Sequence, residues 1–163
     1  FKENQRGRLK DWEGDGCEFF REDKPWSHVD HDVALPCATQ HEIEKDDAKV
    51  IADRGCLFVA EGANMPCTHG ARKMFHDRGV TFGPGKAANA GGVATSCFEM
   101  HQNAAHDAWP KERSLEKLNE VMLHIHEECV EHAPKENGIV NYGAGADRAG
   151  FVKLADAIVA MGV

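Results

Sequence analysis

A segment rich in glycine and alanine, residues 83–96, constrains most strongly what this chain can fold into. It follows the short apolar run 80–82 and continues into a stretch with helical spacing. Such small residues let two backbones, or a backbone and a ligand, approach closely. Asn89 and Ser96 are expected near the start of that helix, where unpaired N–H groups favour an anion. Two interpretations stay open, a tight strand-to-helix turn and a ligand-binding loop. A G-x-x-x-x-G-K-[ST] phosphate loop is excluded because Lys86 precedes alanine.

Two earlier apolar runs end in the same kind of sequence. Residues 29–35 and 56–60 each lead into small and polar residues, and helical spacing separates the runs from one another. Strands that alternate with helices are typical of a parallel sheet, whose carboxyl ends share one edge. We therefore expect Thr39, Asn64 and Asn89 to converge at that edge, where open α/β sheets bind ligands.

Helical spacing continues through much of the remaining chain. The ranges that show it are 4–12, 46–54, 71–78, 90–108 and 115–129. Gly55 and Gly79 are the expected stops of the two helices between strands. The last range carries an apolar stripe that ends at Cys129. A short strand is also expected at residues 17–20.

A connector containing glycine, residues 134–145, leads to a final helix. Asp147 is the expected cap of this helix. Its apolar side chains are expected to pack back on the sheet. They are Phe151, Leu154, Ala155 and Ile158.

Charge and hydropathy argue against two classes of partner. The formal net charge of −8 over 163 residues argues against a nucleic-acid or acidic-membrane surface. No apolar run approaches the roughly 20 residues that span a bilayer. Residues 1–6 lack both the apolar core of a signal peptide and an initiating methionine. We therefore expect no nucleic-acid partner, no membrane partner, and a sequence that is not a complete gene product.

The cysteines indicate a compartment. They are Cys17, Cys37, Cys56, Cys67, Cys97 and Cys129. None is spaced as C-x-x-C. Three disulfides would suit a secreted scaffold, but the regular secondary structure favours reduced thiols and a cytoplasmic protein.

Two groups that contain histidine raise the question of a metal ion. The first lies at residues 28–32, where strand alternation would send neighbouring side chains to opposite faces. The second comprises His126, Cys129 and His132, and Cys129 belongs to the apolar stripe of its helix. We expect structural histidines and no metal site.

Three motifs occur in order: ALPCATQ at 34–40, AEGANMP at 60–66 and PGKAANAGGVATS at 84–96. Together they resemble the carboxy-terminal part of hexameric NADP-dependent glutamate dehydrogenases. The resemblance continues through Trp109 and residues 149–153, so it covers nearly the whole chain. It implies a partial Rossmann-like α/β fold, with a parallel sheet, flanking helices and a C-terminal helical segment.

The resemblance also implies the site residues. The positions that match family contacts to the nicotinamide and ribose end of NADP are Ala38, Thr39, Gln40, Ala63, Asn64 and Asn89. Val93 and Ser96 match positions near the glutamate side chain, and the Ser96 hydroxyl would donate to its carboxylate. All of these are neutral groups that hold a ligand, so no catalytic residue is expected in this chain.

By the same resemblance, residues 1–163 are the C-terminal part of a dinucleotide-binding domain plus C-terminal helices, without the N-terminal substrate domain. The whole enzyme would be a cytoplasmic homohexamer of amino-acid metabolism and nitrogen assimilation. It would interconvert glutamate with 2-oxoglutarate and ammonia, with NADP carrying the hydride. The family's catalytic lysine and its G-x-G-x-x-G fingerprint do not occur here, so the isolated chain is expected to be inactive.

Two alternatives stay open. The first is a related amino-acid dehydrogenase, against which Ser96 argues, because an apolar substrate would leave its hydroxyl unpaired. The second is a truncated, non-catalytic module that binds nucleotide weakly, and the missing lysine supports it. Cys97 and Asp107 depart from the family pattern. An aspartate at a packing position is expected to cost stability unless it reaches water.

Overall fold

The computed structural model describes residues 4, 6–8, 11, 12, 14, 16, 20, 24–136 and 138–162. The elements before the glycine-rich segment are η2 (Pro25–Ser27), β1 (Val33–Ala34), α1 (Lys45–Asp53), β2 (Phe58–Ala60), α2 (His69–Asp77) and β3 (Thr81–Gly83). The later elements are α3 (Gly85–Ala88), α4 (Ala90–Ala105), α5 (Lys111–His132), β4 (Lys135–Glu136), β5 (Ile139–Val140) and α6 (Tyr142–Met161). Residues 5, 9 and 10 of the helix end predicted at 4–12 lie outside the described residues, and its described residues are not α-helical. Of the strand predicted at 17–20, only residue 20 is described.

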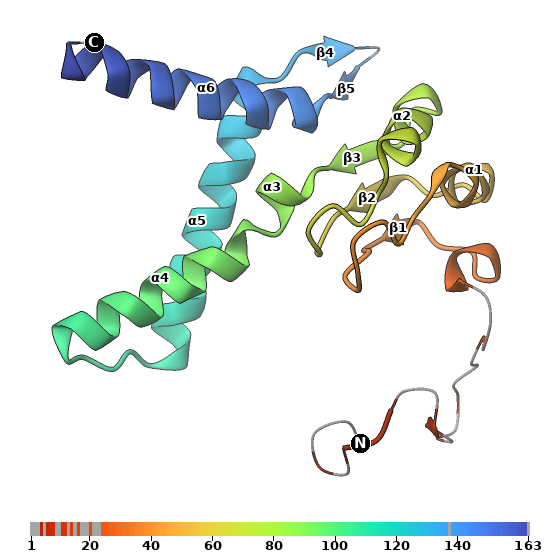
Figure 1. Ribbon diagram of the computed structural model, residues 1–163, viewed down its shortest axis with the longest axis horizontal. Helices are drawn as coiled ribbons and strands as arrows, with labels where there is room; N and C mark the ends of the chain where they lie inside the picture. Colours follow the sequence, from red (N-terminus) through yellow and green to blue (C-terminus); the bar gives the residue numbers. More distant parts are fainter. Residues whose placement is uncertain are drawn as a thin grey trace.

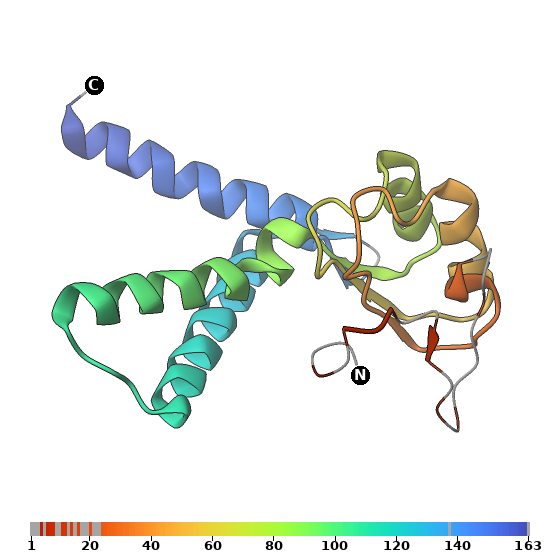
Figure 2. The ribbon, with the colours of Figure 1, turned by 60° about the horizontal axis from the view of Figure 1, so that its bottom comes forward.

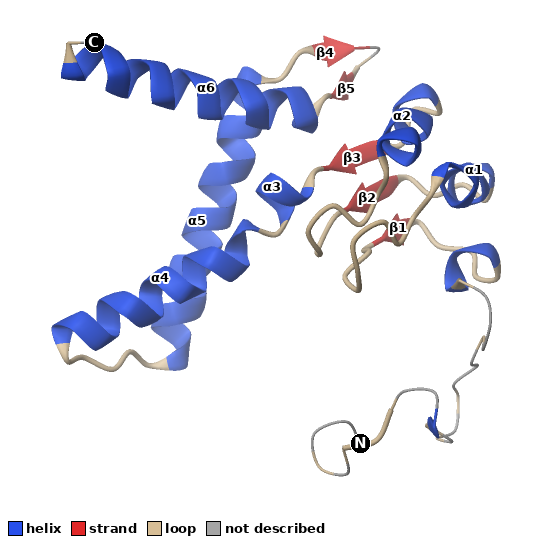
Figure 3. Ribbon diagram, viewed as in Figure 1, coloured by secondary structure: helices blue, strands red, loops and turns tan. Residues whose placement is uncertain are grey.

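Three short strands form a sheet in the order β1-β2-β3, and every pair is parallel (Figure 3). Phe58 of β2 lies opposite Val33 of β1 and Thr81 of β3. Parallel neighbours cannot be joined by a two-residue hairpin, and here α1 and α2 make the connections. The predicted α/β fold with a parallel sheet is confirmed.

The hydrophobic core lies between this sheet and helices α1 and α2, which cover the same face (Figures 1 and 2). Ile51 of α1, Val59 of β2 and Phe75 of α2 are each at most 1% exposed. The Phe75 ring stacks on Phe82 of β3, with centroids 6.1 Å apart. On β2, the neighbour of Val59 points the other way, and Phe58 is 50% exposed. The core is therefore built on one face of the sheet.

Local signals define both connecting helices. At the start of α1, Glu44 and Asp47 cap each other's backbone N–H groups. At the start of α2, the Thr68 hydroxyl accepts a backbone N–H of the first turn at 3.3 Å. Gly55 and Gly79 follow the two helices with φ of +89° and +73°, a conformation that glycine adopts without strain. The predicted glycine stops are confirmed.

The remaining helices form an arm beside the sheet. Helix α4 leads away from β3, α5 returns alongside α4, and α6 leads away again (Figures 1 and 2). Pro110 is the N-cap residue of α5, where its fixed φ suits the start of a helix. The apolar stripe of α5 ends at Cys129, which is 3% exposed.

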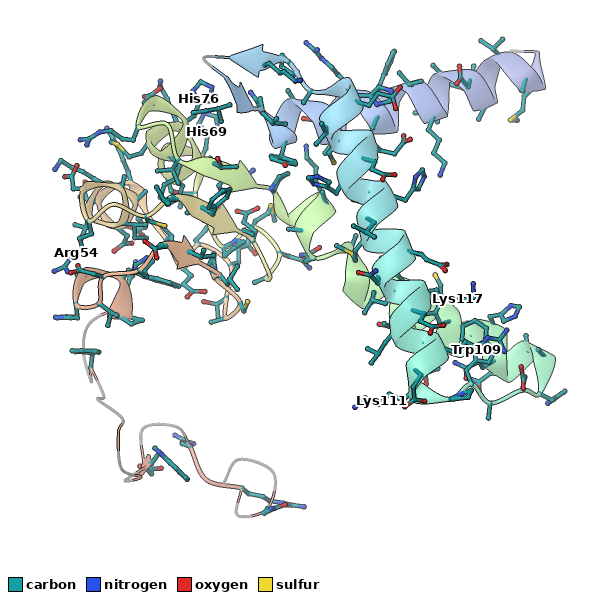
Figure 4. The ribbon with its side chains drawn as sticks, turned by 180° about the vertical axis from the view of Figure 1, so that it is seen from behind. Arg54, His69, His76, Trp109, Lys111 and Lys117 are labelled. Atoms are coloured by element: carbon teal, nitrogen blue, oxygen red, sulfur yellow. The ribbon has the colours of Figure 1, made fainter. Side chains whose placement is uncertain are left out.

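Trp109 closes the turn between α4 and α5 at the far end of the arm, remote from His76 of α2 (Figure 4). The Arg113 guanidinium lies over its ring, 4.3 Å from the centroid. The Asp107 carboxylate accepts the Trp109 indole N–H at 3.2 Å, and the Asp107 side chain is 54% exposed. Asp107 therefore reaches water, and the expected destabilisation does not arise.

The packing predicted for α6 is wrong. Phe151, Leu154 and Ile158 are 70%, 61% and 42% exposed, because the second half of α6 projects from the body instead of lying on the sheet (Figure 2). Val152 and Val159 lie off the stripe of these three residues by helical spacing and are also exposed, so apolar residues occupy more than one face. Periodicity therefore could not define a packing face. Among the described helices, none is both long and apolar enough to cross a membrane.

The predicted start of α6 is also wrong. Its N-cap is Asn141, whose side-chain oxygen accepts the Ala144 N–H at 3.0 Å. Asp147 lies inside the helix and pairs with Lys86 of α3. The connector contains an antiparallel ladder, β4–β5, whose two-residue strands are too short to show alternation in the sequence.

Phe75 offers a direct test of this core. Phe75→Ala should lower the free energy of unfolding by about 3–5 kcal/mol, because it removes a fully buried ring and leaves a cavity. Urea unfolding followed by circular dichroism measures the change. The matched control Phe151→Ala, on the exposed part of α6, should stay within about 0.5 kcal/mol. Equal effects of the two substitutions would contradict the placement of the core.

Candidate functional site

Three loops meet at the carboxyl edge of the sheet, one after each strand. The carbonyl of Pro36, in the loop after β1, accepts the N–H groups of Gly62 and Ala63 at 3.0 and 3.1 Å. Further along the same pair of loops, the His41 N–H donates to the Met65 carbonyl at 3.0 Å. The first two loops are therefore joined by backbone hydrogen bonds.

The first loop is a turn held open to solvent. Glu42 accepts the N–H of Ala38 at 3.1 Å and approaches that of Thr39 at 3.4 Å. Ala38, Thr39 and Gln40 are all exposed. The Cys37 sulfur packs against the backbone of Gly62, where a Cβ atom would overlap it. This close approach explains the glycine in the second loop.

The second and third loops meet through two side-chain amides. Asn89 donates from Nδ2 to the Asn64 Oδ1 at 2.7 Å and to the Ala63 carbonyl at 3.1 Å. Asn89 lies between α3 and α4, and its side chain reaches across to the second loop instead of capping α4. The predicted convergence is confirmed for Asn64 and Asn89. Thr39 lies at the same edge, in the loop joined to theirs.

The sequence analysis did not single out Glu61, which is 2% exposed directly beneath these loops. Its Oε2 accepts the Gly85 N–H at 2.7 Å and its Oε1 accepts the Cys67 N–H at 3.2 Å. Arg72 lies 3.8 Å from Oε1 and donates to the Cys67 carbonyl at 3.2 Å. An ionisable residue directly after a buried strand was the available signal, since a buried carboxylate needs partners.

The glycine-rich segment combines close packing at two positions with an open surface at a third. A Cβ atom at Gly85 would lie 3.0 Å from the Ala63 carbonyl, and one at Gly91 would lie 3.3 Å from Leu118 of α5. These two glycines allow close backbone packing. Gly92 has no neighbouring atom within 4 Å of such a Cβ, so the surface there is open.

Val93 and Ser96 lie on the open surface of α4. Val93 is 66% exposed, and the Ser96 hydroxyl donates to the Gly92 carbonyl at 3.3 Å. Ser96 was expected among the unpaired N–H groups at the helix start. It lies beyond the first turn, because α4 begins at Ala90, so that expectation is wrong.

Two cavities in the described part of the chain adjoin the sheet. One of about 440 Å³ is bounded by α2, β3 and the start of α6, and includes Arg72 and Tyr142. One of about 270 Å³ lies between the sheet and α5, and includes Phe58 and Met122. Neither contains any of the predicted site residues.

Two histidines of α5, His126 and His132, have ordinary structural contacts. The His126 ring lies 5.6 Å from that of Tyr142, and the His132 Nδ1 lies 2.9 Å from the Glu128 carbonyl oxygen. In the described ranges, no three His, Cys, Asp or Glu side chains lie close enough to hold a metal ion. The five described cysteines are free thiols, which rules out three disulfides.

Comparison with known proteins gives consistent matches. The sequence profile of the Glutamate/Leucine/Phenylalanine/Valine dehydrogenase family matches residues 1–162. The NADP-specific glutamate dehydrogenase of Salmonella typhimurium is 50% identical over 163 residues, which are 99% of this chain and 36% of that protein. The NAD-specific glutamate dehydrogenase of Bacteroides fragilis is 45% identical over 148 residues, 91% of this chain and 33% of that protein.

Solved structures agree with the fold. The crystal structure of Plasmodium falciparum glutamate dehydrogenase matches with a TM-score of 0.91 and 41% identity, over 99% of this chain and 35% of that chain. The fold is thus the partial Rossmann-like one that the resemblance implied. The chain spans at most 36% of the length of these three proteins.

The cysteines around the edge allow a labelling test. Burial, and next the nearby Glu61 carboxylate, raise the pKa of the Cys67 thiol well above its ordinary value. Because the thiolate is the reactive form, iodoacetamide at pH 8 should label exposed Cys37 and Cys97 at least tenfold faster than Cys67. Peptide mass spectrometry measures the rates, and 6 M urea should remove the difference.

The raised pKa of Cys67 also predicts how the stability of the fold changes with pH. Below the ordinary thiol pKa of about 8.5, Cys67 is neutral in both the folded and the unfolded chain, and the stability of the fold is unaffected by its titration. As the pH rises above this value, the unfolded chain loses the Cys67 proton first, so the folded state loses stability. Cys67 should therefore become labelled only where the protein begins to unfold at high pH. Equal labelling of Cys37 and Cys67 in folded protein at pH 8 would contradict the burial.

Proposed function

The chain belongs to the Glutamate/Leucine/Phenylalanine/Valine dehydrogenase family, and we propose that it is the carboxy-terminal part of an NADP-dependent glutamate dehydrogenase. In this proposal it supplies the second part of the dinucleotide-binding domain and the C-terminal helices. The whole enzyme interconverts L-glutamate with 2-oxoglutarate and ammonia, as a cytoplasmic homohexamer. The 50% identity to an NADP-specific relative supports NADP as its cofactor.

The observation that carries the proposal is the Asn64–Asn89 amide pair at the carboxyl edge of a parallel sheet. Open α/β sheets bind nucleotides outside this edge. The edge offers small side chains, exposed backbone and neutral amides, which fit the ribose and carboxamide groups of a nicotinamide nucleotide. The residues proposed to hold that end of the cofactor are Ala38, Thr39, Gln40, Ala63, Asn64 and Asn89.

The open surface of α4 begins directly after Asn89 in the chain, and it is where we propose that the substrate binds. Val93 offers an apolar contact, and Ser96 offers a hydroxyl that can turn from the Gly92 carbonyl to a carboxylate. An apolar amino acid would leave that hydroxyl unpaired, which favours glutamate over the other substrates of the family.

In this reading the chain binds and orients, while hydride transfer is the chemistry that bound NADP supplies. None of the proposed contact residues is an acid, a base or a nucleophile. The residue that moves the proton, and the glycine fingerprint for the pyrophosphate, are expected elsewhere in the whole enzyme. The isolated chain should therefore not oxidise glutamate.

A chimera tests the proposal. Residues 1–162 replace the matching segment of the Salmonella typhimurium enzyme, and glutamate-dependent reduction of NADP is measured. We expect turnover. Ser96→Ala should then raise the KM for glutamate at least tenfold, as expected for a lost hydrogen bond to a charged group, and leave the KM for NADP within about twofold.

Thr95→Ala is the matched control for that substitution. The Thr95 hydroxyl lies on the same helix but donates to the carbonyls of Gly91 and Gly92, at 3.2 and 2.8 Å. It should leave both KM values unchanged. A chimera that assembles like its parent but has no activity would favour a non-catalytic nucleotide-binding module. An equal rise of both KM values in Ser96→Ala would make Ser96 structural.

A further inference from the structure

We propose that Glu61 is a positioning residue, whose single carboxylate sets the distance between Asn64 and Asn89. The inference rests on the proposed function for what the two amides bind, but the positioning itself does not. Glu61 is 2% exposed and lies below the edge, so it acts through the loops and not on a ligand.

The two oxygens of Glu61 hold two different loops. Oε1 accepts the N–H of Cys67, six residues along the chain, and Oε2 accepts the N–H of Gly85, 24 residues along. The first bond fixes the end of the loop that carries Asn64. The second fixes the start of α3, which leads to Asn89. One buried side chain, hydrogen-bonded at both oxygens, therefore joins the bases of both amide-bearing segments.

The two N–H groups that Glu61 accepts, those of Cys67 and Gly85, are the anchors of the loops. Each anchor is close enough to an asparagine to control the position of its amide. The Asn89 N–H donates to the Gly85 carbonyl at 2.9 Å, so one helical turn connects the anchor to the amide. The loop that carries Asn64 is held at its other end, where Gly62 and Ala63 donate to Pro36. A displacement at either anchor therefore changes the 2.7 Å contact between the two amides.

Only an acceptor at both oxygens satisfies this geometry. Both backbone partners are donors, and a carboxylate accepts at each oxygen. Glutamine has the same shape but would turn an NH₂ group toward one of the N–H groups. Aspartate keeps the charge but is one methylene shorter, so it can reach only one of them. Arg72, 3.8 Å away, partly compensates the buried charge.

Amide hydrogen exchange of the full 163-residue chain tests the positioning without any ligand. In Glu61→Gln, the N–H of Gly85 or of Cys67 should exchange at least tenfold faster, and the Asn89 side-chain NH₂ resonances should shift. The sheet amide of Val59 should keep its rate. Glu120→Gln is the matched control, because Glu120 lies on the exposed surface of α5, where its carboxylate faces Lys117, and it should change none of these signals. Unchanged exchange at both anchors in Glu61→Gln would overturn the proposal.

Glu61→Asp keeps the test decisive if Glu61→Gln does not fold. In Glu61→Asp, one anchor N–H should exchange faster and the other should stay protected from exchange. Protection of both N–H groups would also overturn the proposal.

The chimera supplies a measurement that a purely structural role of Glu61 would not change selectively. There, Glu61→Gln should raise the KM for NADP at least tenfold and the KM for glutamate by less than threefold, and Glu61→Asp should restore part of the loss. Equal rises of the two KM values would overturn the specific role. An inactive parent chimera would count against the proposed function, while the exchange data would still decide the positioning.

Discussion

Parallel pairing of three very short strands is the constraint on which the rest of this structure depends. Parallel strands need long connections, so α1 and α2 lie between them and bury one face of the sheet. The same pairing directs all three carboxyl ends to one edge. A ladder of two or three residues per strand holds loops in place weakly. The Pro36 carbonyl and the Glu61 carboxylate supply the additional bonds that fix them.

The sequence predicted the sheet, its connecting helices and the meeting of Asn64 with Asn89, because strand-and-helix alternation determines which loop ends share an edge. It did not predict the role of Glu61, since a single acidic residue after a strand does not reveal which N–H groups it will face. The packing of α6 failed for another reason. A helix whose apolar residues are spread around most of its circumference gives only a weak periodic signal to indicate a face. The start of α6 depended on one side-chain bond at Asn141, whereas Asp147 was an equally good cap by residue type.

The glycine-rich segment shows how one run of small residues can have different functions at successive positions. Gly85 brings the chain close to the second loop, Gly91 brings α4 close to α5, and Gly92 leaves the surface open next to Val93. Close packing and an open surface therefore alternate within one helical turn. Such alternation lets a helix be firmly attached on one side and accessible on the other.

Helix α6 is attached near its start, and its second half projects from the body (Figure 2). Its first two turns are held by the Asn141 cap and by the pairing of Asp147 with Lys86, which neighbours Gly85. Its 20 residues extend about 30 Å, so a tilt of about 10° at the base displaces the tip by about 5 Å. Through the pair of Lys86 and Asp147, the base of α6 is joined to the segment that carries Asn89.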